Sequence, residues 1–261
     1  MSVAPHPDWL RPEWEAPQGR ALMTTRAGGV STGPYASLNV GSAVQDEPAA
    51  VEENRRRVAE ALGASLVFLP QVHGSKVLQL KPEWGRPEAK VPKADACIST
   101  IAGLGCAIQV ADCLPVLFAA PKAVGGAHAG WRGLADGVLE NTVRALCEAS
   151  ACEPGEIQAW LGACIGPEAF EVGADVLQAF GVEPRADLGA AQGQLFRYQA
   201  NAAGEARWRA NLPALAALRL RALGVSRLSG GRWCTYSDPS RFFSYRRERL
   251  SGRMVAAITL A

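Results

Sequence analysis

Three short apolar segments in the middle of the chain restrict the fold more than any other feature. They are 104–110 (LGCAIQV), 114–120 (LPVLFAA) and 124–130 (VGGAHAG), and brief connections separate them. Each is rich in residues that favour strands, which predicts buried strands that meet at one end. Asp112 and Cys113 interrupt this apolar region, and a charged residue inside a core needs a partner or a function.

Helical patterns flank these strands. After Asp46 the chain predicts a helix, because Pro48 suits a first helical position and Gly63 is a typical stop signal. The residues that would lie along one side of this helix are Val51, Arg55, Val58 and Leu62. Further strands are predicted at 65–69, 76–80, 157–161 and 254–260, and further helices at 134–148, 174–180 and 212–223.

The chain of 261 residues is expected to form one domain. No linker divides it, and proteins of this length that mix helices and strands are commonly single domains. Residues 1–20 are rich in Pro and Trp and are expected to form an N-terminal arm, which leaves 21–261 as a single catalytic domain. The segment 24–41 (TTRAGGVSTGPYASLNVG) is crowded with Gly, Ser and Thr, so it is either a substrate loop or an ordinary connecting loop.

Charge and cysteine content disfavour several classes of protein. The formal net charge of +2 provides no global basic field for binding nucleic acid or an anionic membrane. The first residues lack a basic segment followed by an apolar run, and no run of about eighteen apolar residues occurs, so export and membrane spanning are not expected. Seven cysteines without regular spacing do not indicate a disulfide framework, which fits a reducing cytoplasm. The expected partner is a small molecule, and no protein partner is inferred.

Three potential metal ligands lie at the ends of apolar runs. His73 falls in a turn between two predicted strands, and Cys113 and His128 belong to the apolar middle of the chain. Histidine and cysteine suit borderline-soft divalent metals, and three protein ligands with an open fourth position describe a catalytic zinc site. From spacing alone, Cys113 could equally be a buried small hydrophobic residue, and each histidine an ordinary surface or core residue.

Several longer motifs closely resemble one family, variously called laccase-domain proteins, polyphenol oxidases or peptidoglycan-editing factors. They recur in family order over nearly the whole chain, which is far more specific than any single motif. The motifs are TTRAGGVSTGPYASLNVG, VEENRRRVAEALG, FLPQVHGSKV, ADACIST, VADCLPVLF, GGAHAGWRGLADGVLENTV, IGPEAFEVG and FFSYRRERLSGRMVAAI.

The resemblance implies one zinc ion bound by the histidine of the QVH motif, the cysteine of the ADC motif and the histidine of the AHAGWRG motif. These are His73, Cys113 and His128, with Cys113 and His128 as catalytic residues. The implied activities are phosphorolysis of adenosine, inosine, guanosine or methylthioadenosine, and hydrolytic deamination of adenosine. Zinc suits the deamination because it lowers the pKa of a bound water to about 7.

The resemblance also implies an α+β fold similar to the catalytic domain of the cytotoxic necrotising factor toxins. That fold is a single domain with a central β-sandwich of mixed sheets flanked by helices. The chain departs from the family pattern at Val110, where the family usually has Thr, and at Cys164 in LGACIGP; neither change removes a metal ligand. The stretch 185–211 matches poorly, so the resemblance predicts nothing about a lid or specificity element there.

Phosphorolysis requires groups that hold phosphate, and the planar arginine side chain can meet phosphate with two parallel hydrogen bonds. The candidates are Arg26, Arg55, Arg132 and Arg246. Each could instead be solvated or paired with a carboxylate. Asn39 could hydrogen-bond the ribose or base of a nucleoside, or be a plain turn residue. Asp112 is interpreted as structural, because neighbours on an extended strand point to opposite faces.

Other functions stay open. In one, Cys113 is a nucleophile and His128 its base, and the protein hydrolyses an amide such as one in a cell-wall precursor. In another, the protein is a metal-dependent binding or scaffold protein without turnover. Copper could replace zinc at the same site and give weak polyphenol oxidase activity. A multicopper centre is excluded, because three histidines cannot supply its imidazole ligands.

Overall fold

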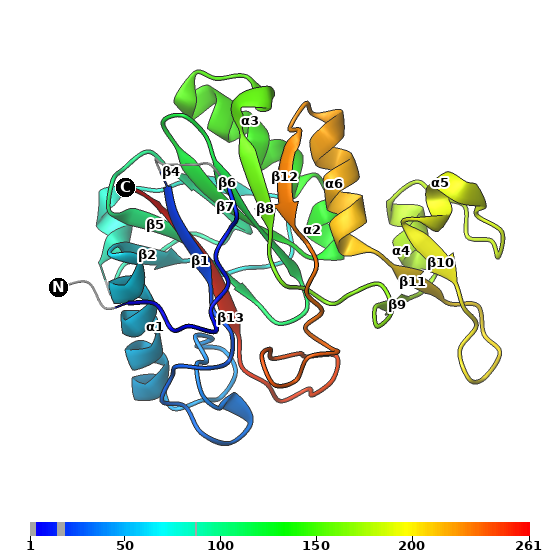
Figure 1. The fold of residues 1–261 in the computed structure, drawn as a ribbon, viewed down its shortest axis with the longest axis horizontal. Helices are drawn as coiled ribbons and strands as arrows, with labels where there is room; N and C mark the ends of the chain where they lie inside the picture. Colours follow the sequence, from blue (N-terminus) through cyan, green and yellow to red (C-terminus); the bar gives the residue numbers. More distant parts are fainter. Residues whose placement is uncertain (1–3, 15–18, 87) are drawn as a thin grey trace.

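Two β-sheets packed face to face form the centre of the molecule, and helices cover their outer faces (Figure 1). The structure is a computed structural model that describes residues 4–14, 19–86 and 88–261. The strands of the four-stranded sheet, in order, are β1 (Gly19–Met23), β13 (Met254–Leu260), β5 (Leu104–Val110) and β2 (Ser65–Phe68). The strands of the six-stranded sheet, in order, are β12 (Arg227–Gly230), β8 (Gln158–Leu161), β6 (Leu114–Ala119), β7 (Val124–Ala129), β4 (Ala96–Ser99) and β3 (Val77–Gln79).

Both sheets contain parallel and antiparallel pairs. In the four-stranded sheet β2 runs parallel to β5 while β13 runs antiparallel to it. In the six-stranded sheet β3 and β12 run parallel to their neighbours, and the pairs between them are antiparallel. These pairings confirm the predicted single-domain α+β fold with a central sandwich of mixed sheets.

The central strands are apolar throughout because both of their faces are buried. Along β6, Val116 and Phe118 contribute to the core beneath the outer helices, whereas Leu117 and Ala119 contribute to the core between the two sheets. Strands of an antiparallel sheet with one solvated face would alternate apolar and polar residues instead. This two-sided burial explains the unbroken apolar segments in the middle of the sequence and confirms the strands predicted there.

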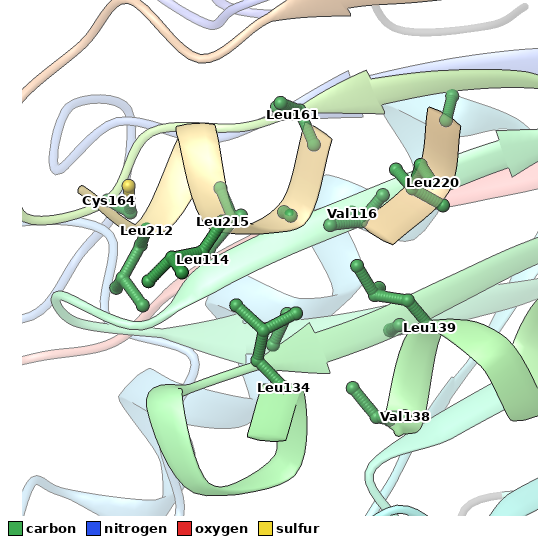
Figure 2. Packing of buried hydrophobic residues seen from close by; sticks show 14 of the residues in the cluster. Leu114, Val116, Leu134, Val138, Leu139, Leu161, Cys164, Leu212, Leu215 and Leu220 are labelled. Atoms are coloured by element: carbon green, nitrogen blue, oxygen red, sulfur yellow. The ribbon is translucent and has the colours of Figure 1, made fainter. Parts of the chain in front are cut away.

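Helices α3 (Val138–Ser150) and α6 (Leu212–Ala222) cover the outer face of the six-stranded sheet. Figure 2 shows side chains of α6, among them Leu212 and Leu215, close to Leu114 of β6. Removing this much apolar surface from water is the main favourable term in folding. The core beneath these helices therefore holds β6 and β7 in place.

Helix α1 (Pro48–Leu62) covers the four-stranded sheet, where Val58 and Leu62 pack in one cluster with Ala107 and Val255. The predicted start at Pro48 and stop at Gly63 are confirmed. Gly63 adopts a φ of 67°, a left-handed conformation that favours glycine and ends the helix.

The prediction of one continuous helix at 134–148 is wrong. A short helix, α2 (Trp131–Ala135), ends at Asp136, and α3 begins afterwards at Val138. Gly137 separates them with a φ of 87°, because this left-handed conformation cannot continue a helix. The break turns the chain between the two helices directly after the AHAGWRG motif.

The other predicted elements are confirmed with small shifts at their ends. The strands predicted at 65–69, 76–80, 157–161 and 254–260 are β2, β3, β8 and β13, and the helices predicted at 174–180 and 212–223 are α4 (Ala174–Ala179) and α6. Short 3-10 helices occur at Gly33–Tyr35, Pro82–Gly85 and Pro154–Glu156.

A third, small sheet extends from one side of the sandwich (Figure 1). Its strands, in order, are β10 (Phe196–Tyr198), β11 (Trp208–Ala210) and β9 (Glu171–Val172), with α4 and α5 (Gly189–Gly193) beside them. The sequence did not predict this sheet, whose strands are too short to show a clear alternation of apolar and polar residues. Strands β10 and β11 and helix α5 fall within 185–211, the stretch that matches the family pattern poorly.

The N-terminal segment lies against the sandwich. Leu10 forms an isolated bridge with Met23 of β1, and Trp9 is buried. Residues 1–3 and 15–18 of the predicted arm lie outside the described residues, and the boundary at residue 20 stays a prediction. Within the described part of the chain, no helix is both long and apolar enough to cross a membrane.

Candidate metal centre

The chain crosses from the four-stranded sheet to the six-stranded sheet at two points that each carry a potential metal ligand. His73 lies between β2 and β3, and Cys113 lies between β5 and β6. His128 lies on β7, where it pairs with Pro115 near the start of β6. This antiparallel pairing places His128 beside Cys113. One ligand atom from each of His73, Cys113 and His128 lies within 4.8 Å of the other two.

The three side chains differ in exposure. His128 is only 4 % exposed, Cys113 is half-buried and His73 is exposed to solvent. The Cys113 Sγ lies 4.0 Å from His73 Nε2, and the two imidazole rings meet edge to face with centroids 4.8 Å apart. The cluster is thus closed by the protein on one side and open to solvent on the other, as a site that admits a substrate requires.

Asp95 holds two of the three ligands in place. Its carboxylate is fully buried and accepts a hydrogen bond of 2.9 Å from His128 Nδ1. It also accepts hydrogen bonds from the backbone N–H groups of Val72, His73 and Gly74, the shortest of them 2.8 Å. These bonds fix the turn at His73, whose φ of 63° is unusual for a residue other than glycine. One carboxylate therefore sets both the turn that carries His73 and the orientation of His128.

The charges of the cluster favour ionised side chains. Burial alone would raise the pKa of Asp95, but its hydrogen bonds with His128 and the backbone lower it below the usual value. Burial would also raise the pKa of Cys113, yet His128 and His73 lower it to about 6. His128 shows the opposite balance, since Cys113 and Asp95 outweigh burial and raise its pKa to about 9. At neutral pH, metal-free Cys113 is therefore a thiolate beside a protonated His128.

The donor set fits a transition metal. A thiolate and two imidazoles are ligands that zinc and copper accept, and Cys113 loses its proton readily here. Because His128 uses Nδ1 to donate to Asp95, its Nε2 is left for a metal, an arrangement that recurs in metal-binding histidines. His73, Cys113 and His128 thus form a His-Cys-His site that could hold one ion.

Metal-free protein should show an unusual pH profile for alkylation at Cys113. Thiolate, not thiol, reacts with iodoacetamide, so the rate at Cys113 should level off above a midpoint near pH 6. Cys147 is an internal control, since burial raises its pKa to about 11 and its rate should keep rising into alkaline solution. Peptide mass spectrometry after timed labelling measures both rates, and added zinc should block the reaction at Cys113 alone. A Cys113 midpoint near that of an ordinary thiol, about 8.5, would contradict this electrostatic account.

A pocket of about 880 Å³ opens over the metal centre, and His73, Cys113 and His128 line it. Its volume suits a small organic molecule. Aromatic side chains on its wall are Phe68, Trp131, Phe170 and Tyr245, and cationic side chains are Arg55, Lys93, Arg132, Arg246 and Arg253. The pocket thus combines flat apolar surfaces with an excess of positive charge, which suits a ligand that has both an apolar ring and an anionic group.

The candidate substrate residues occupy different places. Arg55 and Arg246 line the pocket, as does Arg132. Arg26 does not line it, because its guanidinium donates hydrogen bonds to the carbonyl oxygens of Ala36 and Pro239. Asn39 is fully buried behind the pocket wall, and its side-chain amide bonds to Gly41, Asp46 and the Arg253 backbone.

Asp112 joins the start of β6 to the C-terminal part of the pocket wall. Its carboxylate accepts hydrogen bonds from Thr235 Oγ1 at 2.6 Å and from the Arg246 backbone N–H at 2.7 Å. Asp112 has a φ of 90°, so it is not in extended conformation, and the expected alternation of strand neighbours does not apply to it. Its contacts agree with the interpretation of Asp112 as structural, and they place the Arg246 backbone beside the metal centre.

Asp95 and Arg253 were not among the residues predicted from the sequence. Asp95 stands in the ADACIST motif directly before β4, and a charged residue at the edge of an apolar run could have been expected to need buried partners. Arg253 gives no such signal. It belongs to a basic segment of the chain, and only the structure shows that its side chain is less exposed than others in that segment.

Comparison with known proteins connects this chain to one family. Residues 20–261 match the family described as "Multi-copper polyphenol oxidoreductase laccase". A Pseudomonas aeruginosa protein named "Purine nucleoside phosphorylase PA4543" is 46% identical, over 97% of this chain and 98% of its own. An Escherichia coli protein named "Purine nucleoside phosphorylase YfiH" is 45% identical, over 95% of this chain and 97% of its own.

Solved structures match over nearly the full length as well. Protein NMB0706 of Neisseria meningitidis has a TM-score of 0.83 and 40% identity, over 97% of this chain and 99% of its own. YlmD from Geobacillus stearothermophilus has a TM-score of 0.84 and 33% identity, over 97% of this chain and 96% of its own.

Proposed function

The chain belongs to the multi-copper polyphenol oxidoreductase laccase family, and from that premise we propose that it is a zinc-dependent purine nucleoside phosphorylase that also deaminates adenosine. The observation that carries the proposal is the pocket, in which a His-Cys-His ligand set lies among aromatic and cationic side chains. The names of its relatives support the phosphorylase activity. The proposed substrates are adenosine, inosine, guanosine and methylthioadenosine, with phosphate.

The pocket offers distinct surfaces to the parts of a nucleoside. Purines stack well on aromatic rings, and Trp131 and Phe170 supply such rings. Phosphate suits arginine, and we propose that Arg55 and Arg246 contact it. A bound zinc ion would act as a Lewis acid held by His73, Cys113 and His128.

Zinc is proposed over copper because neither phosphorolysis nor hydrolytic deamination changes an oxidation state, so the proposed reactions need a Lewis acid and not a redox metal. Copper could occupy the same three ligands, and weak polyphenol oxidation would then follow from metal substitution. All seven cysteines are free, which supports our proposal that the protein works in the reducing cytoplasm.

Elemental analysis of gently purified protein, run beside assays of inosine and adenosine turnover, tests the proposal. We expect about one zinc per chain, phosphate-dependent release of hypoxanthine from inosine, and release of ammonia from adenosine. Metal-bearing protein that binds nucleosides without converting them would overturn the enzymatic proposal in favour of a binding protein.

Arg246 gives a mutational test of the same proposal. Its guanidinium donates to the Glu171 carbonyl oxygen and lies over Phe170, while its other donors are available to a ligand. Arg246→Ala should raise the KM for phosphate about tenfold, the usual worth of one hydrogen bond to a charged group, and leave the melting temperature nearly unchanged. Arg221→Ala, at an exposed position on α6, is the matched control. An unchanged KM for phosphate would remove Arg246 from the phosphate site.

The pair of Cys113 and His128 favours a second candidate function, a cysteine-dependent amide hydrolase that acts on a peptidoglycan precursor. The lowered pKa of Cys113 would suit a nucleophile. A thiolate bound to zinc is a poor nucleophile, so the metal content separates the two functions. Metal-free protein that hydrolyses amides through Cys113 would support the hydrolase, whereas stoichiometric zinc with phosphorolysis would exclude it.

A further inference from the structure

Two arginines from distant parts of the chain line the pocket next to Gly41 and Ser42. Arg55, from α1, donates through Nε to the Val40 carbonyl oxygen at 2.8 Å and through Nη2 to Ser42 Oγ at 3.3 Å. Arg253, directly before β13, packs its side-chain stem on Gly41 so closely that a Cβ there would lie 2.7 Å from Arg253 Cγ. Gly41 is therefore required for the approach of the Arg253 side chain to the pocket wall.

Neither arginine has a carboxylate partner among the described residues. On the same helix as Arg55, both Arg56 and Arg57 pair with Glu53. Burial lowers the pKa of Arg55, and it lowers the pKa of Arg253 although Cys113 and Asp112 nearby partly oppose the shift. Both cations are thus withdrawn from water without a carboxylate in direct contact. Burying an unpaired charge is costly, so this arrangement calls for an anion from outside the protein.

The hydrogen bonds that these arginines do make fix their positions and leave donors free. Arg253 Nη1 donates to the carbonyl oxygens of Ser251 and Gly252, and the Arg253 backbone N–H donates to Asn39 Oδ1. Within the described chain, Nε and Nη2 of Arg253 and Nη1 of Arg55 have no protein partner. Each guanidinium also lies over an aromatic ring, Arg55 over Phe68 and Arg253 over Tyr245. Two preorganised donor groups thus line the same pocket.

We propose that Arg55 and Arg253 form the subsite for inorganic phosphate, with the oxyanion between their guanidinium groups beside Gly41 and Ser42. The assignment rests on the proposed phosphorylase function and adds Arg253 to it. An oxygen of bound hydrogen phosphate forms a bond to the ribose C1′ while the bond from C1′ to the purine nitrogen breaks. The purine takes the electron pair of the broken bond and the proton of the phosphate, so the products are ribose 1-phosphate and the free base.

Isothermal titration with inorganic phosphate alone, together with steady-state kinetics, tests the subsite. Arg253→Met keeps the length of the side chain and the backbone contact to Asn39 but removes the free donors. It should weaken phosphate binding and raise the KM for phosphate by about 10- to 100-fold, the worth of one or two charge-assisted hydrogen bonds. The KM for inosine should change by less than about threefold. Arg57→Met, which removes an arginine paired with Glu53, should change neither.

Two further variants and a titration with a nucleotide complete the test. Arg55→Met should reproduce the effect, and Arg253→Lys should show a smaller loss, which covers the case in which one variant fails to fold. Phosphate affinity and KM that are unchanged in the folded Arg253 variants would overturn the subsite. Titration with adenosine 5′-monophosphate distinguishes a nucleotide phosphate from the free ion: a loss of affinity for the nucleotide alone would overturn the assignment to inorganic phosphate. Wild-type protein that binds phosphate through these arginines but does not cleave inosine would overturn the proposed function and leave the subsite standing.

Discussion

Cys113→Ser should lose nearly all bound zinc and reduce the kcat for inosine phosphorolysis by about a thousandfold or more. A serine hydroxyl stays protonated near neutral pH and is a poor zinc ligand, whereas Cys113 supplies a thiolate because its two histidine neighbours lower its pKa to about 6. Loss of an outer partner of a metal ligand typically costs 10- to 100-fold in affinity or activity, and loss of a ligand itself is expected to cost more.

Elemental analysis and single-turnover kinetics measure these effects in the same preparations. Cobalt substitution adds a direct readout, because the thiolate-to-cobalt charge-transfer band of the wild type should vanish in Cys113→Ser. Cys234→Ser is the matched control: Cys234 is also half-buried and accepts a hydrogen bond from the Gly166 N–H, but it lies outside the pocket wall. Retention of zinc and turnover by Cys113→Ser would rule out the three-ligand centre.

Asp95→Ala should weaken zinc binding by about 10- to 100-fold and lower the free energy of unfolding of the metal-free protein by about 3 kcal/mol. The carboxylate satisfies His128 Nδ1 and three backbone N–H groups. Its removal therefore leaves buried donors without acceptors and frees the turn that carries His73. Metal affinity, unlike stability, reports directly on the placement of the ligands.

Competition with a chelator measures the zinc affinity, and urea denaturation of metal-free protein measures the stability. Asp95→Asn should restore little of the zinc affinity or of the stability. When the side-chain oxygen of this variant accepts the hydrogen bond from His128, its NH₂ group faces an N–H donor of the turn, and two donors cannot bond to each other. Asp136→Ala, an exposed position after α2, should change stability by less than about 0.5 kcal/mol and leave zinc affinity intact. Asp95→Ala with wild-type zinc affinity would show that the fold positions His73 and His128 without this carboxylate.

The parts of the fold that sequence alone predicted are those with a strong local signal. The strand β6 could be predicted because two-sided burial makes its residues apolar throughout, and α1 could be predicted from Pro48 and Gly63 at its ends. The break at Gly137 was missed because the apolar spacing continues across it, while the left-handed backbone of a single glycine decides the outcome. The small sheet of β9, β10 and β11 was missed because strands of two or three residues carry no periodicity.

The candidate site was also predicted only in part from the sequence. Spacing alone left the roles of His73, Cys113 and His128 open, the resemblance to the family singled them out as metal ligands, and the structure brings them together. Their support could not be predicted, because Asp95 acts through contacts with residues more than twenty positions away in the chain. The convergence of Arg55 and Arg253 joins still more distant segments. Pairings of this kind depend on how the two sheets stack, which no local pattern encodes.

His73 and Cys113 lie at the two points where the chain passes from the four-stranded to the six-stranded sheet, so a bound metal ion would connect these two segments. An ion bound there would link the connection that carries His73 to the start of β6 and to β7, at the end of the sandwich where the pocket opens. Local opening of that end then requires release of the ion, so the population of opened molecules falls with the free metal concentration by mass action. At low metal concentration the protein would therefore open more often at its pocket, and a protease that attacks such openings would cleave it faster.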